Sequence, residues 1–147
     1  MKNILILFFL LLVGCALPTS EQALISKERI QHVCHVEPLE ETLSKLVPKL
    51  SSCYNRSSTV PVYTGNTYTP QITLSQQLIE KRTDDDSRVF IVVGDSKYYG
   101  LRVAFEKGET EACPTKITMH TMNFAWERHA SRVKKWLSEP EAGCQNL

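Results

Sequence analysis

Four widely spaced cysteines constrain the fold of this chain more than any other feature of its sequence. The chain has five cysteines, and apart from Cys15 near its start they are an even number: Cys34, Cys53, Cys113 and Cys144. No two of these four form the Cys-x-x-Cys pair common in metal sites. In an oxidising compartment such a set pairs into two disulfides, each closing a long loop. A single domain is expected as well, because 147 residues are too few for two ordinary domains.

The first residues indicate that the chain is exported to such a compartment. Residues 4–13 form an uninterrupted apolar run that follows Lys2. In a helix this run would rise only about 15 Å, half the hydrocarbon thickness of a bilayer, so it is too short to span a membrane. A basic residue, a short apolar run and small residues after it are typical of a secretory signal peptide, here residues 1–14.

Leu12-Val13-Gly14-Cys15 resembles the lipobox of bacterial lipoproteins, in which signal peptidase II cuts before the cysteine. By this resemblance Cys15 begins the mature chain and carries acyl chains such as palmitate on its thiol. Ala16 stands where enterobacterial lipoproteins retained in the inner membrane have an aspartate, so the resemblance implies an outer-membrane protein facing the periplasm. The alternative is an ordinary signal peptide whose cut lies near a cysteine.

The charge of the chain argues against nucleic acid as a partner. Loss of residues 1–14 removes Lys2 and leaves 16 basic and 16 acidic side chains. Binding to nucleic acid or to an anionic membrane surface needs a basic excess that this balance does not provide. Membrane attachment is therefore expected through the acyl chains on Cys15. The polar, aperiodic residues 15–27 predict a flexible tether ahead of a single domain at residues 28–147.

Hydrophobic periodicity predicts a strand and a helix at the start of that domain. Residues 28–36 alternate as the residues of a strand do. Pro38 suits the first turn of a helix, and Pro48 is expected to kink this helix or to begin a second short one that ends near Cys53. The apolar stripe of the helix consists of Leu39, Leu43, Leu46 and Leu50.

Strands separated by turn signals are predicted in the middle of the chain, and a second helix near its end. A short edge strand is expected at residues 60–63, followed by a turn at Gly65-Asn66, and Tyr63 to Tyr68 form either an exposed recognition loop or a partly buried hairpin. Asn123 is predicted to cap the last helix. The other strands are predicted at 71–82, 88–93, 98–106 and 110–123, with Tyr99, Leu101, Val103 and Phe105 on one face, and the last helix has a stripe of Trp126, Ala130, Val133 and Leu137.

This order of strand, helix, four or five strands and helix predicts an α+β fold. We expect a mostly antiparallel, curved sheet of five or six strands, with the N-terminal and C-terminal helices on one face. The order over residues 28–138 resembles the helix-grip topology of START and Bet v 1-like domains, in which a curved sheet wraps a long C-terminal helix. The chain is shorter than most such domains, so a large interior cavity is not expected.

The predicted topology also suggests how the cysteines pair. If the first and last strands pair antiparallel, Cys34, late in the first, lies opposite Cys113, early in the last. Cys53, after the first helix, then pairs with Cys144, after the second. A closed loop of about 80 or 90 residues stabilises the fold by roughly 4–5 kcal/mol in the chain-entropy model.

The histidines do not form a recognisable catalytic or metal-binding set. His32, Cys34 and His35 are the most suggestive cluster, but on a strand His35 points away from the other two, so no metal ion is expected. His120 and His129 lie on predicted regular elements among apolar neighbours. We interpret them as core or boundary residues.

Other sequence motifs of catalysis are also missing. Residues 84–86 are three consecutive aspartates without the spacing of a calcium-binding loop, and we interpret them as a solvated turn. No nucleophile elbow, zinc-protease motif or phosphate-binding glycine loop is present. We therefore expect neither a cofactor nor an enzymatic activity.

Two functions from different classes remain. The first is a non-enzymatic, membrane-anchored lipoprotein of the cell envelope that binds a partner protein or another envelope component. The alternative is a carrier or sensor of a small apolar ligand, held between the curved sheet and the final helix. A sealed pocket of several hundred cubic ångströms would favour the carrier, and a filled core would favour the binding protein.

Overall fold

The computed structural model describes residues 17–64, 67–94 and 97–144, and the side chains of all of these except residues 58–74. The predicted signal peptide, the lipobox and Cys15 lie outside the described residues, as does the turn predicted at Gly65-Asn66. None of the helices within the described residues is long and apolar enough to cross a membrane.

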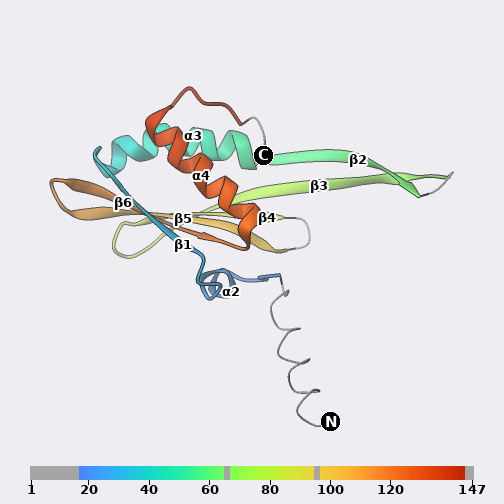
Figure 1. Cartoon of the computed structure of the whole chain (residues 1–147), viewed down its shortest axis with the longest axis horizontal. Coiled ribbons are helices and arrows are strands. Elements are labelled where there is room, and N and C mark those ends of the chain that lie inside the picture. The colour runs from blue at the N-terminus through green and yellow to red at the C-terminus, as the bar shows by residue number, and fades with distance from the viewer. Residues whose placement is uncertain (1–16, 65–66, 95–96, 145–147) are drawn as a thin grey trace, which may run out of the picture.

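In the described part of the chain, six antiparallel strands form one sheet with helices on both of its faces (Figure 1). The elements in chain order are α2 (Glu21–Ile25), β1 (Ile30–His35), α3 (Leu39–Tyr54), β2 (Arg56–Thr64), β3 (Thr67–Arg82), β4 (Arg88–Gly94), β5 (Tyr99–Thr110), β6 (Cys113–Thr121) and α4 (Phe124–Ser138). The order within the sheet is β1-β6-β5-β4-β3-β2, so the first strand pairs with the last and the others form a meander. The predicted α+β class and antiparallel sheet are confirmed.

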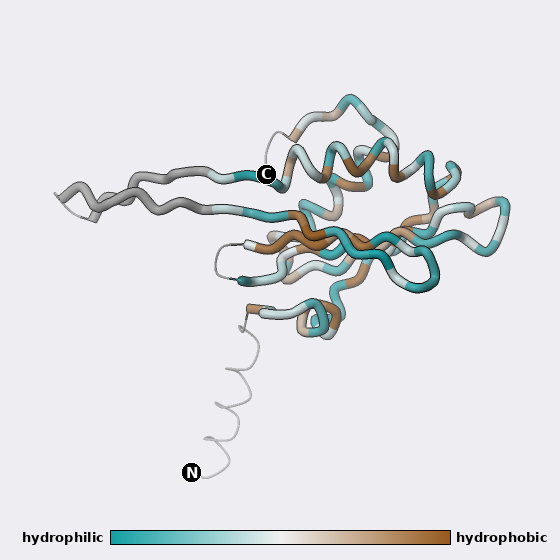
Figure 2. Tube along the Cα trace, turned by 180° about the vertical axis from the view of Figure 1, so that it is seen from behind, coloured by the Kyte–Doolittle hydropathy of each residue, from teal (hydrophilic) through white to brown (hydrophobic). Residues whose placement is uncertain are grey.

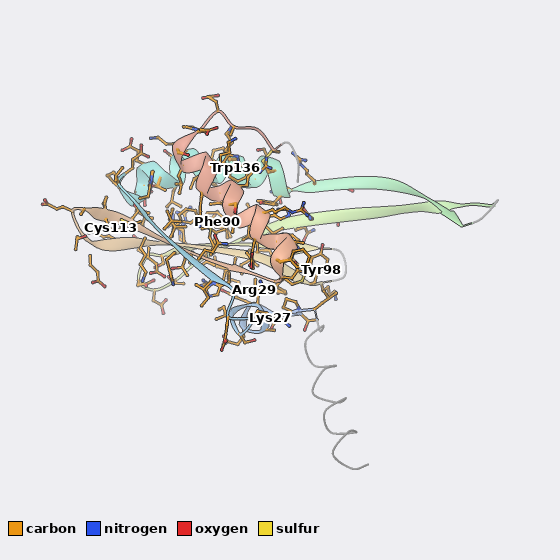
Figure 3. The ribbon with its side chains drawn as sticks, viewed as in Figure 1. Lys27, Arg29, Phe90, Tyr98, Cys113 and Trp136 are labelled. Atoms are coloured by element: carbon orange, nitrogen blue, oxygen red, sulfur yellow. A yellow bond between two sulfur atoms is a disulfide. The ribbon has the colours of Figure 1, made fainter. Side chains whose placement is uncertain are left out.

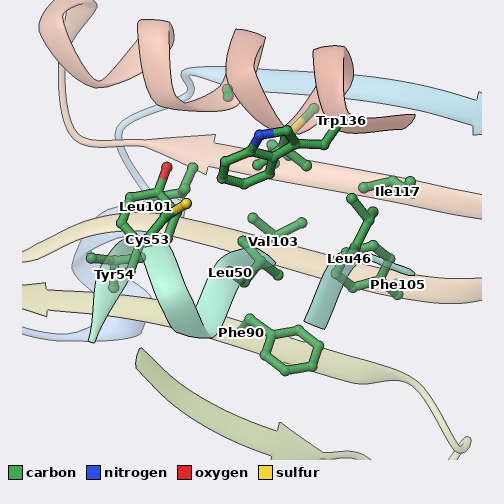
Figure 4. Packing of buried hydrophobic residues seen from close by; sticks show 14 of the residues in the cluster. Leu46, Leu50, Cys53, Tyr54, Phe90, Leu101, Val103, Phe105, Ile117 and Trp136 are labelled. Atoms are coloured by element: carbon green, nitrogen blue, oxygen red, sulfur yellow. The ribbon is translucent and has the colours of Figure 1, made fainter. Parts of the chain in front are cut away.

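Helices α3 and α4 cover one face of the sheet and enclose the main hydrophobic core, as their apolar stripes predict (Figures 1 and 4). Asn123 caps α4 as expected, with Oδ1 accepting from the N–H groups of Ala125 and Trp126 at 3.0 and 3.2 Å. Trp136 is buried, whereas Leu137 is only partly buried. The core consists of Leu43, Leu46, Leu50, Cys53, Tyr54, Phe90, Val92, Leu101, Val103, Phe105, Ile117, Met119, Trp126, Ala130, Val133 and Trp136.

Pro48 does not divide α3. The helix runs from Leu39 to Tyr54, so the expectation of a second short helix is wrong. A proline inside a helix removes a backbone hydrogen bond and costs about 3 kcal/mol. Pro48 itself is exposed, while Leu50 and Cys53 beyond it are fully buried. Because burial of these later side chains depends on helix continuing past the proline, packing outweighs the lost hydrogen bond.

Tyr99 lies on the opposite face of β5 from the core residues that follow it, contrary to the predicted alternation. Val92 of β4 pairs with Leu101, but Val93 pairs with Tyr99, so Gly100 is the extra residue of a β-bulge. An extra residue moves the side chains before it to the other face. A Cβ at this glycine would lie 2.5 Å from an aromatic ring of α4, which leaves room only for glycine.

The segment at residues 20–27 is folded, so the predicted flexible tether through residue 27 is wrong for this part. Helix α2 packs on the sheet face opposite α3 and α4 (Figure 1), and its Leu24 is fully buried. Glu21 forms ion pairs with Lys81 of β3 at 2.7 Å and with Arg102 of β5 at 2.8 Å. A helix this short shows no hydrophobic period, and contacts with distant strands hold it in place.

Both predicted disulfides are present, Cys34–Cys113 and Cys53–Cys144. Antiparallel pairing of β1 with β6 brings the end of the first strand beside the start of the last, which is the arrangement that predicted the first bond. The second bond joins the end of α3 to the tail after α4. In each the Cα atoms are 5.4 Å apart, an ordinary distance for a disulfide.

Candidate functional site

The most prominent surface feature is a two-stranded arm that extends beyond the rest of the sheet. Strand β3 pairs with β4 only from Gln76 to Arg82, whereas residues 67–75 pair with β2 alone. We call residues 56–75 the arm. At about 3.4 Å per residue, the part of β3 that β4 does not cover is roughly 30 Å long. Figure 1 shows the arm reaching to one side, well past the other strands, and Figure 2 shows from behind the part of the sheet that it leaves.

Beyond Arg56 at its root the arm is uncharged, and its edges have no neighbouring strand among the described residues. Residues 57–79 contain no charged side chain. Strand β2 is the last strand of the sheet, and β3 has no second neighbour before Gln76. Natural sheets usually protect such edges with charged side chains, short strands, prolines or bulges, and beyond Arg56 the arm has only one proline in each strand and one shift in register. Pro61 and Pro70 lie at a shift in the register of the two strands, where a missing N–H removes no regular ladder bond.

The root of the arm is fixed to α3. The Leu78 N–H donates to Asn55 Oδ1 at 2.8 Å, and Arg56 Nε donates to the Ser52 carbonyl at 3.4 Å. The side chain of Leu78 packs against the main core. The direction of the arm is therefore set by the packing of the domain.

The arm includes the edge strand that was predicted around Val60 to Tyr63. Strand β2 is at the edge as expected, but it is longer than the sequence predicts. Tyr63 and Tyr68 are register partners across the arm. Both alternatives for these tyrosines, an exposed recognition loop and a partly buried hairpin, concern side chains outside the described ones.

His32, Cys34 and His35 do not converge on one point. His32 Nδ1 lies 3.2 Å from Thr118 Oγ1, and His35 Nε2 lies 3.2 Å from Glu37 Oε2, on the other face of β1. Cys34 is held in its disulfide. Within the described ranges, no group of three or more histidine, cysteine, aspartate or glutamate side chains is placed to hold a metal ion.

Tyr54 and His129 form a hydrogen-bonded pair that the sequence did not predict. The Tyr54 hydroxyl lies 3.2 Å from His129 Nδ1, and the imidazole stacks on Trp126 with ring centroids 4.3 Å apart. Burial, together with the charges of Arg128 and Arg132, lowers the pKa of His129 to about 4. Burial also raises the pKa of Tyr54. At neutral pH both groups are therefore uncharged, and the tautomer of the imidazole sets which of them donates the hydrogen bond.

The stability of the protein is expected to fall as the pH is lowered from 6.5 towards 4. In the unfolded chain His129 titrates at its ordinary pKa of 6.5, whereas in the folded protein its pKa is about 4. Between these values the unfolded state binds more protons, so full stability is present only above pH 6.5. Denaturant titrations at a series of pH values should show a shallower decline for His129→Gln than for the wild type. Equal slopes would contradict this role of His129.

His120 is expected to add to the same pH dependence. It is 7 % exposed, and among the described atoms its Nδ1 has no hydrogen-bond partner. Burial, the charge of Arg102 and the nearby His32 lower the pKa of His120, against a smaller opposite effect of Glu21. His129→Gln should therefore reduce the pH dependence without removing it.

The polar hollows of the described surface are open to solvent. One, of about 420 Å³, lies between α4 and the tail and is lined by basic side chains of that helix together with Glu139. Another, of about 380 Å³, lies at the turn between β3 and β4. The aspartates of residues 84–86 form this turn, and Asp85 Oδ1 accepts hydrogen bonds from the Thr83 hydroxyl and from the Ser87 N–H. The interpretation of the aspartates as a hairpin turn agrees with these contacts.

The space between the sheet and its two covering helices is occupied by side chains (Figure 4). A hollow beside Trp136, Leu46 and Leu137 measures about 10 Å³, room for about one water molecule. No family model, curated protein or solved structure matches this chain. Its function is therefore inferred from its own residues.

Proposed function

We propose that this chain is a lipid-anchored protein of the bacterial cell envelope that binds a partner protein through the arm and catalyses no reaction. The arm is the observation that carries the proposal. A two-stranded ribbon is at best marginally stable in water and is stabilised when another strand or surface packs on it. An uncharged ribbon of roughly 30 Å with two open edges is suited to such packing.

The chemistry of the arm favours an extended segment of another protein as the partner. A strand can add to the open edge of β2 through main-chain hydrogen bonds, and side chains of the two strands then give specificity. Because residues 57–79 carry no charge, this binding should depend only weakly on salt.

A binding protein is better supported than a carrier of a small apolar ligand. A carrier needs an interior pocket of several hundred cubic ångströms. Among the described residues, side chains of α3, α4 and the sheet pack together where a helix-grip-like pocket would lie, and the hollow beside Trp136 is only about 10 Å³. The packed core thus favours a protein that binds a partner over a carrier of a small apolar ligand.

The placement of the histidines supports a non-enzymatic function. His32 and His35 lie on opposite faces of β1, and Cys34 is oxidised. With a pKa of about 4, His129 takes up a proton poorly at neutral pH, and its hydrogen-bond partner is another buried side chain.

Cys15 is the proposed site of membrane attachment. Each buried methylene of an acyl chain contributes about 0.8 kcal/mol, and one chain alone holds weakly, so two or three chains are expected. With Ala16 next to Cys15, we propose that the protein is delivered to the outer membrane and faces the periplasm.

A shortened arm provides the variant that tests the proposed function. Ser57 and Ser75 are register partners, as are Thr64 and Thr67 on either side of Gly65-Asn66. Placing a Gly-Asn turn directly between Ser57 and Ser75 would remove the distal arm and keep the hairpin. This shortened-arm protein should fold with a Tm within about 5 °C of the wild type, because the main core lies outside the deleted segment.

The partner can be found by placing a photo-crosslinking amino acid at Tyr63 of the full-length protein in cells, with Lys134 on α4 as the control position. We expect one major protein adduct from the arm and none from Lys134. The isolated partner should bind the shortened-arm protein about 100-fold more weakly than the wild type, or about 2.7 kcal/mol. Equal affinities would contradict the role of the arm, and an apolar molecule bound in the purified domain would favour the carrier.

A further inference from the structure

The chain enters the domain at a fixed point. The Pro18 carbonyl accepts a hydrogen bond from the Tyr99 N–H at the start of β5, at 2.8 Å. Ser20 then caps α2 by accepting from the Ala23 N–H at 3.1 Å, and Leu24 of this helix is fully buried. The position of the backbone is therefore defined from Pro18 onward.

This fixed entry leaves little length between the domain and the proposed lipid. Cys15 precedes Leu17 by two residues, which reach about 7 Å when fully extended. The surface around Leu17 must then lie within roughly 10 Å of the thioether at the bilayer surface. A flexible tether through residue 27, by contrast, would let the domain take any orientation.

Three exposed apolar side chains surround this entry point, and we call them the membrane-facing rim: Leu17 is 53 % exposed, Ile30 45 % and Phe124 75 %. An ion pair of 2.5 Å joins Arg29, next to Ile30, to Glu127 in the first turn of α4. This contact brings the start of β1 beside the start of the helix that Phe124 begins.

Backbone contacts connect Leu17, the third member of the rim, with Phe124. The Met122 N–H donates to the Gly100 carbonyl at 3.0 Å, and the neighbouring Tyr99 donates its N–H to the Pro18 carbonyl. Neighbouring backbone segments of a sheet are about 4.8 Å apart, so Leu17 and Phe124 lie at the same end of the sheet. Figure 3 shows Lys27, Arg29 and Tyr98 at this end, close to where the described chain begins.

The rim is distinct from the other large exposed apolar side chain of the described residues. Val36 is 77 % exposed and follows the far end of β1, about 20 Å from Ile30 by strand length. The charged side chains next to the rim are of both signs, since Lys27, Arg29, Lys97 and Arg128 are accompanied by Glu28 and Glu127. This end of the domain offers apolar contact together with a small basic excess.

We propose that the membrane-facing rim rests on the surface of the phospholipid bilayer that holds the acyl chains of Cys15. The inference depends on the lipidation proposed above. Its consequence is a fixed orientation, in which α2 and the first turn of α4 lie towards the bilayer and α3 lies away from it. In Figure 1 the arm extends to the side of the sheet, whereas α2 and the first described residues lie below it. The arm then runs beside the membrane, where it is accessible to a partner.

The orientation can be measured by the reactivity of lysines. The full-length lipidated protein is added to vesicles of phosphatidylethanolamine and phosphatidylglycerol, and a membrane-impermeant reagent acylates its amines. Lys97, two residues before Tyr99, should react about 5-fold more slowly than in soluble Cys15→Ser protein, because the bilayer covers the rim. The exposed Lys134 on α4 should react equally fast in both proteins. Equal rates at Lys97 would overturn the proposal.

Two matched substitutions separate contact of the rim from anchoring by lipid. Phe124→Glu should restore most of the Lys97 reactivity while the protein still floats with the vesicles, because a charged side chain at this position opposes contact with the interface. Val36→Glu, at an equally exposed position, should leave the Lys97 rate of the anchored protein unchanged. The same loss of protection in both variants would refute a specific rim. If the wild-type protein does not float with vesicles at all, the proposed lipidation fails instead.

Discussion

Replacing both Cys53 and Cys144 with alanine is expected to lower the free energy of unfolding by about 3–5 kcal/mol. The bond spans 91 residues of sequence, so its loss frees a large number of unfolded conformations. It also fastens the end of α3, where Cys53 is fully buried, to the tail after α4. For a domain with a typical stability of about 5–15 kcal/mol this is a large fraction. Guanidinium titration followed by tryptophan fluorescence and circular dichroism would measure the loss.

The other disulfide provides a matched control for this experiment. Cys34–Cys113 spans 79 residues, so its entropic contribution should be similar, but it fastens the exposed Cys34 on the edge strand β1. Its removal should speed hydrogen exchange mainly in β1, whereas removal of Cys53–Cys144 should speed it in α3 and α4. A loss below about 1 kcal/mol for the Cys53 and Cys144 variant would contradict the stabilising role assigned to that bond.

Cys15→Ser is expected to move the protein completely from the membrane fraction to the soluble fraction. A serine hydroxyl cannot form the diacylglyceryl thioether, and the mature chain has no net charge to hold it on an anionic surface. The three side chains of the membrane-facing rim are too few to replace two or three acyl chains. Fractionation and Triton-phase partitioning of the two proteins would show the difference.

The same variant should fold as the wild type does. The four other cysteines pair with one another, so neither disulfide requires Cys15. The Tm of purified Cys15→Ser protein should therefore match that of the delipidated wild type. Retention in the membrane, or loss of the folded state, would contradict this separation of anchoring from stability.

The sequence was sufficient for the architecture because its patterns are local and strong. Leucines at helical spacing define α3, and an asparagine cap with an apolar stripe defines α4. Both disulfides could be assigned from one assumption, that the first and last strands pair antiparallel. Strands β1 and β6 do pair in this way. Each of these signals comes from spacing along a single element or from the order of the elements.

The errors arose where distant contacts decide the structure. Helix α2 has too few residues for a hydrophobic period and is held by Lys81 and Arg102, far along the chain. The sequence around Gly100 does not indicate that this residue forms a bulge, which places Tyr99 on the other face of β5. The Tyr54–His129 pair joins residues 75 positions apart. The length of the arm depends on where β4 ends, which the sequence of β3 does not contain.

These errors also changed how the candidate site is understood. With α2 docked on the sheet, the domain begins close to the proposed anchor and not at the end of a long tether. Residues 67–75 of β3 extend beyond the part that pairs with β4, and Tyr63 and Tyr68 therefore lie on the two strands of a projecting arm. The proposed anchor and the proposed binding surface therefore belong to separate parts of the fold.

The most direct test of lipid anchoring is the intact mass of the protein purified from a bacterial host. Lipid anchoring predicts a chain that begins at Cys15 and carries a diacylglyceryl group, with or without a further amide-linked acyl chain, and has four cysteines in two disulfides. The added mass should be absent from Cys15→Ser. A wild-type chain that begins elsewhere, or that begins at Cys15 with an unmodified thiol, would contradict lipid anchoring.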